Sequence, residues 1–327
     1  MDNPIRRYLE DAIAAEKSFE TQLEGFAKEA TMTQAQELFT QHAGETRSQY
    51  QALTERLEKL GGSTSSVKSF FAHLFNMSPK MAQLGHEEEE RATQDLIMAF
   101  AVENAEVAMY ESLSIAAEIA GDLVTSRLVK QIQAQEQAAA DKIWPLIPIA
   151  SVQGLRAAAT NDSGEKENVV LRYLQDTEAA ERNFEDALAS FSKAGDQSEV
   201  QSLMSMMSRK ARTQHERLEA RIKSLGGTTS TAKSLLAHLL AFTPVTAQLG
   251  HSESEKSSQH LMITYAAASA EMGMYEALAS AAAASNDSTT EQLARTLQSE
   301  EKDDHRLAWQ ALPQSVRSSS SLVLGNR

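Results

Sequence analysis

The stretch RYLEDAIAAEKSFETQL, residues 7–23, decides the fold, and it returns as RYLQDTEAAERNFEDAL at residues 172–188. Its apolar residues recur every three or four positions, as they do on the buried face of an amphipathic helix. Further pairs keep the same offset of 165 residues: LGGSTSSVKSFFAHL (60–74) with LGGTTSTAKSLLAHL (225–239), and AEVAMYESL (105–113) with AEMGMYEAL (270–278). The chain is therefore a tandem duplication of one helical unit.

Each unit contains four long segments with a helical period and none with the period of a strand, so the predicted class is all-α. In the first unit the expected helices run from about 4 to 29, 33 to 60, 78 to 120 and 122 to 143, with glycines at 61, 62 and 121 as stop signals. The second and third helices are joined by a long connection, which contains a short helix at about 65–75. A connection of that length predicts a ferritin-like four-helix bundle, because it can cross the bundle and let the second and third helices run parallel.

The duplication predicts two such bundles, at residues 1–150 and 169–314. Residues 151–168 lack an apolar period and collect Asn, Asp, Ser and Gly, which indicates a linker. Residues 315–327 are expected to be a mobile tail. We expect the two bundles to pair as an internal pseudo-dimer, and the sequence leaves open whether the fused pair forms a further homo-oligomer.

Charge and composition exclude several classes of function. The formal net charge of −14 argues against binding nucleic acid or an anionic membrane. The chain has no cysteine, which excludes disulfides, iron–sulfur clusters and thiol catalysis. No segment has the length and apolarity of a membrane span or a signal peptide, so a cytoplasmic location is expected.

Polar residues interrupt the buried stripe of every helix in the first unit. They lie near the middle of the helices, and each helix contributes at least one carboxylate. The polar residues are Glu16, His42, Glu45, Glu103, Glu106 and Glu136. Several buried carboxylates cannot share a dry core as free anions, so they need protons, water, cations or a metal. Mostly carboxylate ligands with one imidazole suit two divalent iron or manganese ions.

A structural interpretation stays open beside the metal site. A single inward glutamate can be partly solvated or paired with arginine, and His42 can be an ordinary core histidine. Tyr110 and Tyr275 can hydrogen-bond an inward carboxylate or fill space. The recurring histidines at 73, 86, 238 and 251 are expected to pack or cap in the crossover, and the run Glu87–Glu90 to be a solvated first helical turn.

The second unit differs at these positions. It keeps Glu181, Glu271 and Glu301, but Met207, Lys210 and Ala268 replace His42, Glu45 and Glu103. Lys210 is expected to neutralise carboxylates in place of a metal. Asp304 and His305 could join Glu301 in a weaker mono-metal site. We therefore expect the first unit to bind metal and the second to be a structural half.

The segments YLEDAIAAEKSFETQL, QHAGETRSQYQALTERLEKLGG, GHEEEERATQDL and VENAEVAMYESL resemble the YciE/YciF-type ferritin-like proteins of bacteria. The resemblance covers nearly all of both repeats. It implies a ferritin-like bundle, dimerisation, an association with stress responses and a di-iron-type site. Its matching positions are Glu16, His42, Glu45, Glu103, Glu106 and Glu136, whereas Gln135 departs from the acidic pair of the family.

Two functions from different classes follow. The first is a di-metal oxidoreductase, in which iron or manganese reacts with peroxide or oxygen or oxidises Fe(II) during stress. The second is a non-enzymatic helical protein without metal, in which the duplication makes a pseudo-dimer. Iron storage in a closed shell of many subunits is disfavoured by the fused copies.

Overall fold

The structure is a computed structural model, and it describes residues 4–63, 90–161, 165–229 and 253–325. This part of the chain is helical throughout, which confirms the predicted all-α class. The elements are α1 (Pro4–Glu29), α2 (Thr33–Lys59), α5 (Arg91–Ile119), α6 (Leu123–Ile143), α7 (Leu146–Asn161), α8 (Glu165–Phe191), α9 (Ser198–Ser224), the 3₁₀ turn η2 (Glu253–Glu255), α11 (Lys256–Ala284) and α12 (Ser288–Gly325).

The first repeat forms a bundle of two helical hairpins, α1 with α2 and α5 with α6. Contacts between α2 and α6 join Gln49 to Glu136 and Arg56 to Asp122, so these two helices run antiparallel. Helices α5 and α6 are also antiparallel, because Ser114 contacts Ser126 and Gln133 bonds to the carbonyl of Val107. Helices α2 and α5 therefore run parallel, as the predicted crossover requires.

The crossover itself lies outside the described residues. So do the short helix expected at 65–75, the expected start of the third helix at about 78, and the histidines at 73, 86, 238 and 251. The ends of α2 and α5 follow the predicted stop signals, with φ of +75° at Gly61 after α2 and +74° at Gly121 after α5. Asn286, the counterpart of Gly121, takes φ of +61°, a conformation that asparagine tolerates better than most residues.

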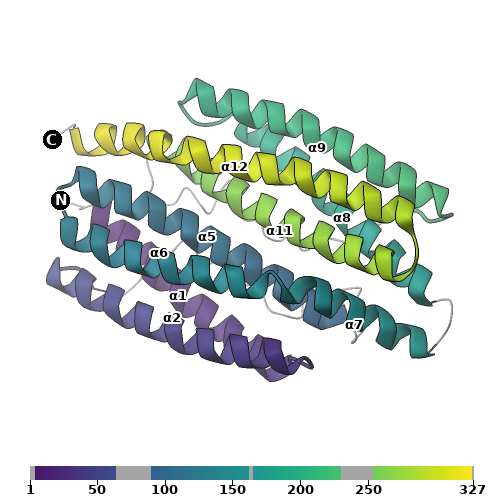
Figure 1. The fold of residues 1–327 in the computed structure, drawn as a ribbon. Helices are drawn as coiled ribbons and strands as arrows, with labels where there is room; N and C mark the ends of the chain where they lie inside the picture. Colours follow the sequence, from purple (N-terminus) through teal and green to yellow (C-terminus); the bar gives the residue numbers. More distant parts are fainter. Residues whose placement is uncertain (1–3, 64–89, 162–164, 230–252, 326–327) are drawn as a thin grey trace.

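The second repeat forms an equivalent bundle from α8, α9, α11 and the first part of α12, and the two bundles lie side by side (Figure 1). Helices α5 and α11 occupy the middle of the assembly and contact each other. Most of their residues are buried on every face, because each helix packs within its own bundle and against the other one. The repeats therefore form one continuous hydrophobic core.

The predictions of an irregular linker and a mobile tail are wrong. Residues 146–161 form α7, which packs on α11 of the other repeat, and α12 continues to Gly325 and packs on α5. The two segments are equivalent under the offset of 165 residues, so they are a fifth helical element of each repeat. Pro145 lies at the break between α6 and α7, whereas α12 passes unbroken through Gln310 at the same place. Small residues such as Ser151 and Ser319 are buried in these contacts, so their polarity does not indicate a loop.

A reciprocal pair of ion pairs joins the repeats. Arg7 contacts Glu255 at 2.6 Å, and its counterpart Arg172 contacts Glu90, the counterpart of Glu255, at 2.9 Å. Both glutamates are buried, so the expectation that Glu90 belongs to a solvated turn is wrong. This exchange of equivalent contacts is the pattern of a two-fold dimer interface and supports the internal pseudo-dimer.

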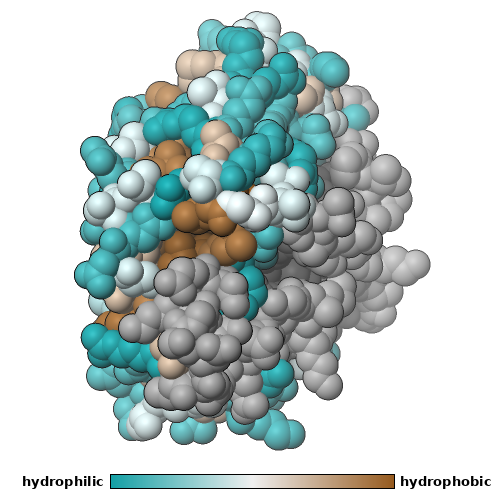
Figure 2. Space-filling view, turned by 90° about the vertical axis from the view of Figure 1, so that its right-hand side faces the viewer, coloured by the Kyte–Doolittle hydropathy of each residue, from teal (hydrophilic) through white to brown (hydrophobic). Residues whose placement is uncertain are grey.

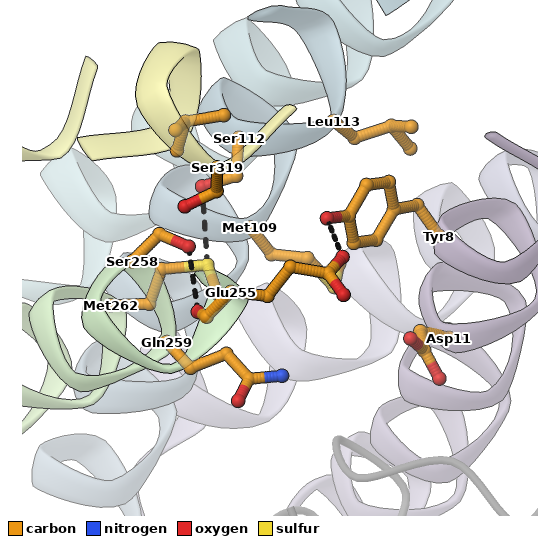
Figure 3. Close-up of a pocket in the computed structure, with 11 residues that line it drawn as sticks. Tyr8, Asp11, Met109, Ser112, Leu113, Glu255, Ser258, Gln259, Met262 and Ser319 are labelled. Atoms are coloured by element: carbon orange, nitrogen blue, oxygen red, sulfur yellow. Dashed lines mark hydrogen bonds between the residues drawn. The ribbon is translucent and has the colours of Figure 1, made fainter. Parts of the chain in front are cut away.

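A small cavity lies beside one of these ion pairs (Figure 3). It is lined by Tyr8, which donates a hydrogen bond to Glu255, and by residues of α5, α11 and α12. Its volume of about 30 Å³ has room for about one water molecule. The cavity is therefore too small to be a ligand site, and none of the inward carboxylates at the bundle centres lines it.

The surface of the described part agrees with a chain that is acidic and polar outside. Figure 2 shows mainly hydrophilic residues on one side of the molecule, with a small group of hydrophobic residues among them. Within the described residues, each helix is either too short or too polar to cross a bilayer.

Candidate metal centre

Four helices of the first repeat direct polar side chains to one place in the bundle. Glu16 of α1, Glu103 and Glu106 of α5 and Glu136 of α6 are completely buried, and His42 of α2 is 3% exposed. Each lies on the apolar stripe of its helix, which is why the packing that buries the leucines also buries these groups. The sequence prediction that these five residues point inward is confirmed.

The five residues form two groups that share one member. His42, Glu103 and Glu136 offer ligand atoms that all lie within 4.8 Å of one another, and so do Glu16, Glu106 and Glu136. Glu136 belongs to both groups. A carboxylate with two oxygens between two ligand sets is the arrangement that bridges a pair of metal ions.

Neutral donors hold one oxygen of some of these carboxylates and leave the other one open. The Tyr110 hydroxyl donates a hydrogen bond to Oε1 of Glu16, and Gln49 Nε2 donates to Oε1 of Glu136 at 2.5 Å. Oε2 of Glu16 and both oxygens of Glu106 are buried without a hydrogen-bond partner. Buried carboxylate oxygens without partners are costly, so these atoms fit a cation or a proton in the space between them.

The electrostatics of the cluster point the same way. Burial raises the pKa of Glu16 and Glu106 well above the ordinary value, and neighbouring carboxylates, Glu136 among them, raise it further. Burial raises the pKa of Glu136 to about 8. Burial alone would lower the pKa of His42, but Glu103 and Glu136 outweigh it and raise that pKa to about 12. Without a cation, the cluster therefore keeps protons at neutral pH.

Glu45 belongs to neither group, although the sequence predicted it as a ligand. Its side chain is 34% exposed and lies 3.2 Å from Nδ1 of His42, on the side of the ring away from Glu103. Gln41 donates a hydrogen bond of 2.8 Å to it. A carboxylate on Nδ1 fixes the orientation of the imidazole and leaves Nε2 to face the cluster, as metal-binding histidines require.

In the second repeat only one of the two groups remains. Glu181, Glu271 and Glu301 are completely buried, and their ligand atoms lie within 4.8 Å of one another. They are the counterparts of Glu16, Glu106 and Glu136. The other group is missing because Met207 and Ala268 stand at the places of His42 and Glu103.

The remaining sequence candidates lie beside this second group. Lys210 contacts Asp304 at 3.0 Å and donates to the carbonyl oxygen of Glu300. His305 stacks on Tyr265 with ring centroids 3.9 Å apart, and burial lowers its pKa to about 4. The structure therefore does not bring Asp304 or His305 into the group of Glu301. Burial and the neighbouring Asp304 raise the pKa of Glu301 to about 7, and Lys210 acts in the opposite direction.

A surface groove lies beside the cluster in the first repeat, and ion pairs bridge the equivalent place in the second. The groove has a volume of about 760 Å³, lies between α2 and α6, and is lined by Glu45, Gln49, Ala52 and Gln135 among others. At the equivalent place Arg217 contacts Glu300 at 2.9 Å, and the Lys210–Asp304 pair also spans α9 and α12.

Sequence reasoning did not identify Gln49 and Gln214 as part of the centre. Gln49 interrupts the leucine seam of α2 and recurs as Gln214, which donates to Oε1 of Glu301 at 2.9 Å. The signal was present as an uncharged polar residue on a buried stripe in both repeats. Of the two roles considered for the tyrosines, the structure shows hydrogen bonding to an inward carboxylate. Tyr110 donates to Glu16, and Tyr275 donates to Glu181.

The family comparison agrees with the duplication. A family model described as "Domain of unknown function (DUF892)" matches residues 6–156 and again residues 165–319. No curated protein and no solved structure matches the chain. The two matches cover both bundles and most of the fifth helical elements. The chain therefore belongs to the DUF892 family, a ferritin-like family, and carries two copies of its domain.

Proposed function

We propose that the first repeat holds two divalent iron or manganese ions and that this pair carries out redox chemistry. His42, Glu103 and Glu136 would hold one ion, and Glu16, Glu106 and Glu136 the other. The sharing of Glu136 between the two groups is the observation that carries the proposal. The donor set of carboxylates with one imidazole suits these two metals.

The residues around the cluster fit such a pair of ions. Five buried side chains supply four carboxylates, so two divalent cations would balance their charge. Tyr110 and Gln49 orient Glu16 and Glu136, and Glu45 orients His42 from the other side of its ring. The groove between α2 and α6 gives small molecules a route from solvent toward the cluster.

A bound pair of these metals would supply electrons to peroxide or oxygen and accept them from Fe(II). The buried packing would exclude bulk water from the cluster. When a cation binds, His42 would release its proton to solvent and bind the cation through Nε2. The chain has no cysteine, so electrons would come from the substrate itself or from a separate donor. We place the protein with the YciE/YciF-type members of the family, in a stress-related role in the cytoplasm.

Manganese binding by the purified full chain tests this proposal. We expect His42→Met combined with Glu103→Ala, which copies the second repeat into the first, to remove one ion per chain. Peroxide consumption by the iron-loaded protein should fall in parallel. Metal content that is equal in the wild type and in this variant, with both proteins folded, would exclude the proposed centre.

The second candidate is a structural protein in which protons, not metals, occupy the cluster. The raised pKa of Glu16, Glu106 and Glu136 favours it, because carboxyl groups that are neutral at pH 7 need no cation. The two candidates differ in one thermal measurement. A chelator should lower the melting temperature of a metal protein and leave that of the structural protein unchanged.

A further inference from the structure

The second repeat keeps a complete half of the centre. Three buried carboxylates, Glu181, Glu271 and Glu301, converge from α8, α11 and α12, and their ligand atoms lie within 4.8 Å of one another. They correspond one by one to the group of Glu16, Glu106 and Glu136. The substitutions in the second repeat remove the histidine-containing group and leave this one intact.

The hydrogen bonds that orient the carboxylates are also intact. Tyr275 donates to Oε1 of Glu181, and Gln214 donates to Oε1 of Glu301 at 2.9 Å, as Tyr110 and Gln49 do in the first repeat. In both repeats the donors hold Oε1 and leave Oε2 facing the shared space. The three carboxylates of the second repeat are therefore oriented by the same hydrogen-bond donors as their counterparts, so that one ligand atom of each lies near a common point.

The oxygens that face this point have no partner outside the group of three carboxyl groups, and Glu271 and Glu301 contact each other. Oε2 of Glu181, Oε2 of Glu301 and both oxygens of Glu271 are buried without a hydrogen-bond partner. Glu271 is completely buried, and neither Lys210 nor an arginine is paired with it among the described ion pairs, since Lys210 contacts Asp304 instead. Unpartnered oxygens of this kind need a cation or a shared proton.

We propose that the second repeat binds a single divalent cation of the iron or manganese class between Glu181, Glu271 and Glu301. Three carboxylates carry one charge more than a divalent cation can balance, and Lys210 is already paired with Asp304, so one of the three would keep a proton. Asp304 and His305 are not ligands of this site. The ion pairs of Lys210 with Asp304 and of Arg217 with Glu300 bridge α9 and α12 over it, so its ion should exchange more slowly than those of the first repeat.

The inference extends the proposed function to the second repeat but does not require the centre of the first repeat to be occupied. The matched variants are Glu271→Gln in the second repeat and Glu106→Gln in the first, which remove one charge at equivalent places and keep the side-chain volume. The full-length protein is stripped of metal, equilibrated with Mn²⁺ and washed, and its manganese is measured per folded chain. We expect each variant to hold one ion fewer than the wild type.

The two proposals can fail separately. If Glu271→Gln keeps the metal content of the wild type while Glu106→Gln lowers it, the single-ion site does not exist and the centre of the first repeat stands. If only Glu271→Gln lowers the content, the single-ion site stands and the first repeat is empty. Circular dichroism verifies the fold of each variant.

Electron paramagnetic resonance of the wild type provides a measurement that needs no variant. Two Mn²⁺ ions that share Glu136 are magnetically coupled, whereas an ion held by Glu181, Glu271 and Glu301 has no neighbouring ion. We expect the loaded protein to show the spectrum of an isolated Mn²⁺ that persists after free ions are removed and that a chelator removes last. The absence of any isolated signal would overturn the single-ion site.

Discussion

Glu136 is the residue on which the proposed centre depends, because it belongs to both groups of ligand atoms. Its position on α6 opposite His42 and Glu16 makes it the neighbour of every other charged group in the cluster. Gln49 donates to one of its oxygens, and Nε2 of His42 lies 3.4 Å from the other. The cluster can therefore be tested through single residues in two ways. One is the titration of Glu136, and the other is removal of a hydrogen-bond donor to a carboxylate.

The metal-free protein should become less stable as the pH rises from 6 to 8. Burial raises the pKa of Glu136 from 4.5 to about 8, so between these values the folded protein binds a proton that the unfolded chain has released. The stability from this group is complete below 4.5 and is lost as the pH approaches 8, with a limiting slope of about 1.4 kcal/mol per pH unit for each such proton. His42, with its pKa raised to about 12, changes stability in the same direction above its ordinary value of 6.5.

Urea unfolding of the chelator-treated protein at several pH values measures this dependence. Glu136→Gln should flatten it, because the amide does not titrate. A metal-free protein that gains stability between pH 6 and 8 would contradict the proposed protonation of the cluster.

Tyr110→Phe should weaken both the fold and metal binding, because it removes the hydroxyl that donates to Oε1 of Glu16 and leaves that oxygen buried. We expect a loss of about 1–3 kcal/mol in the free energy of unfolding of the metal-free protein. Loss of a group that orients a ligand typically lowers metal affinity about 10- to 100-fold. Calorimetric titration with Mn²⁺ measures the affinity, and Tyr8→Phe, which removes a hydroxyl at the repeat interface, is the control that should leave it unchanged.

At the scale of the helices, the repeats differ in the groove between α2 and α6, which we propose as the route to the cluster. Ala52 and Gln135 line the open groove of the first repeat, and their counterparts Arg217 and Glu300 form an ion pair across the second. With Lys210 and Asp304, the repeats therefore differ here in four side chains on facing helices and not in the helices themselves.

Ala52→Arg combined with Gln135→Glu should build that ion pair into the first repeat. We expect the number of bound ions to stay the same and their removal by a chelator to become slower by about tenfold, the effect of roughly 1.4 kcal/mol on a barrier. Stopped-flow measurement of metal release gives the rate. Ala52→Arg alone, which adds the cation without its partner, is the comparison, and an unchanged release rate in the double variant would show that the groove is not the route.

The helices and most of the cluster could be predicted from sequence because helical periodicity fixes which residues share a face. Glu16, His42, Glu103, Glu106 and Glu136 were placed on buried stripes in this way. Glu45 lies one turn from His42 but at the exposed edge of its stripe, and periodicity does not distinguish an edge from a centre. Helix α7 was missed because its small and polar residues are buried against a helix of the other repeat, which a local pattern does not reveal.

At the scale of the whole molecule, the two repeats are tied by equivalent ion pairs in both directions. Arg7 of the first repeat reaches Glu255, and Arg172 of the second reaches Glu90. The fifth helical elements cross in the same reciprocal way, α7 onto α11 and the end of α12 onto α5. Fusion of the repeats thus keeps the interface of a two-fold dimer while allowing the carboxylate clusters of the two repeats to differ.

Arg7→Ala and Arg172→Ala should destabilise the chain by similar amounts. Each variant removes an arginine from an ion pair with a buried glutamate, a change that typically costs about 3–5 kcal/mol. Arg47→Ala is the control, because Arg47 is 54% exposed and its ion pairs with Glu20 and Glu24 should contribute about 1 kcal/mol or less. Urea unfolding checks all three. A negligible effect of both interface variants would show that the ion pairs do not hold the repeats together.

The most direct test of the central claim is a crystal structure of the manganese-loaded protein with anomalous scattering measured at the manganese edge. We predict two anomalous peaks in the first repeat, one on each side of Glu136, with His42 and Glu103 at one and Glu16 and Glu106 at the other. Carboxyl groups hydrogen-bonded to each other or to water, with no anomalous peak between α1, α2, α5 and α6, would contradict the account.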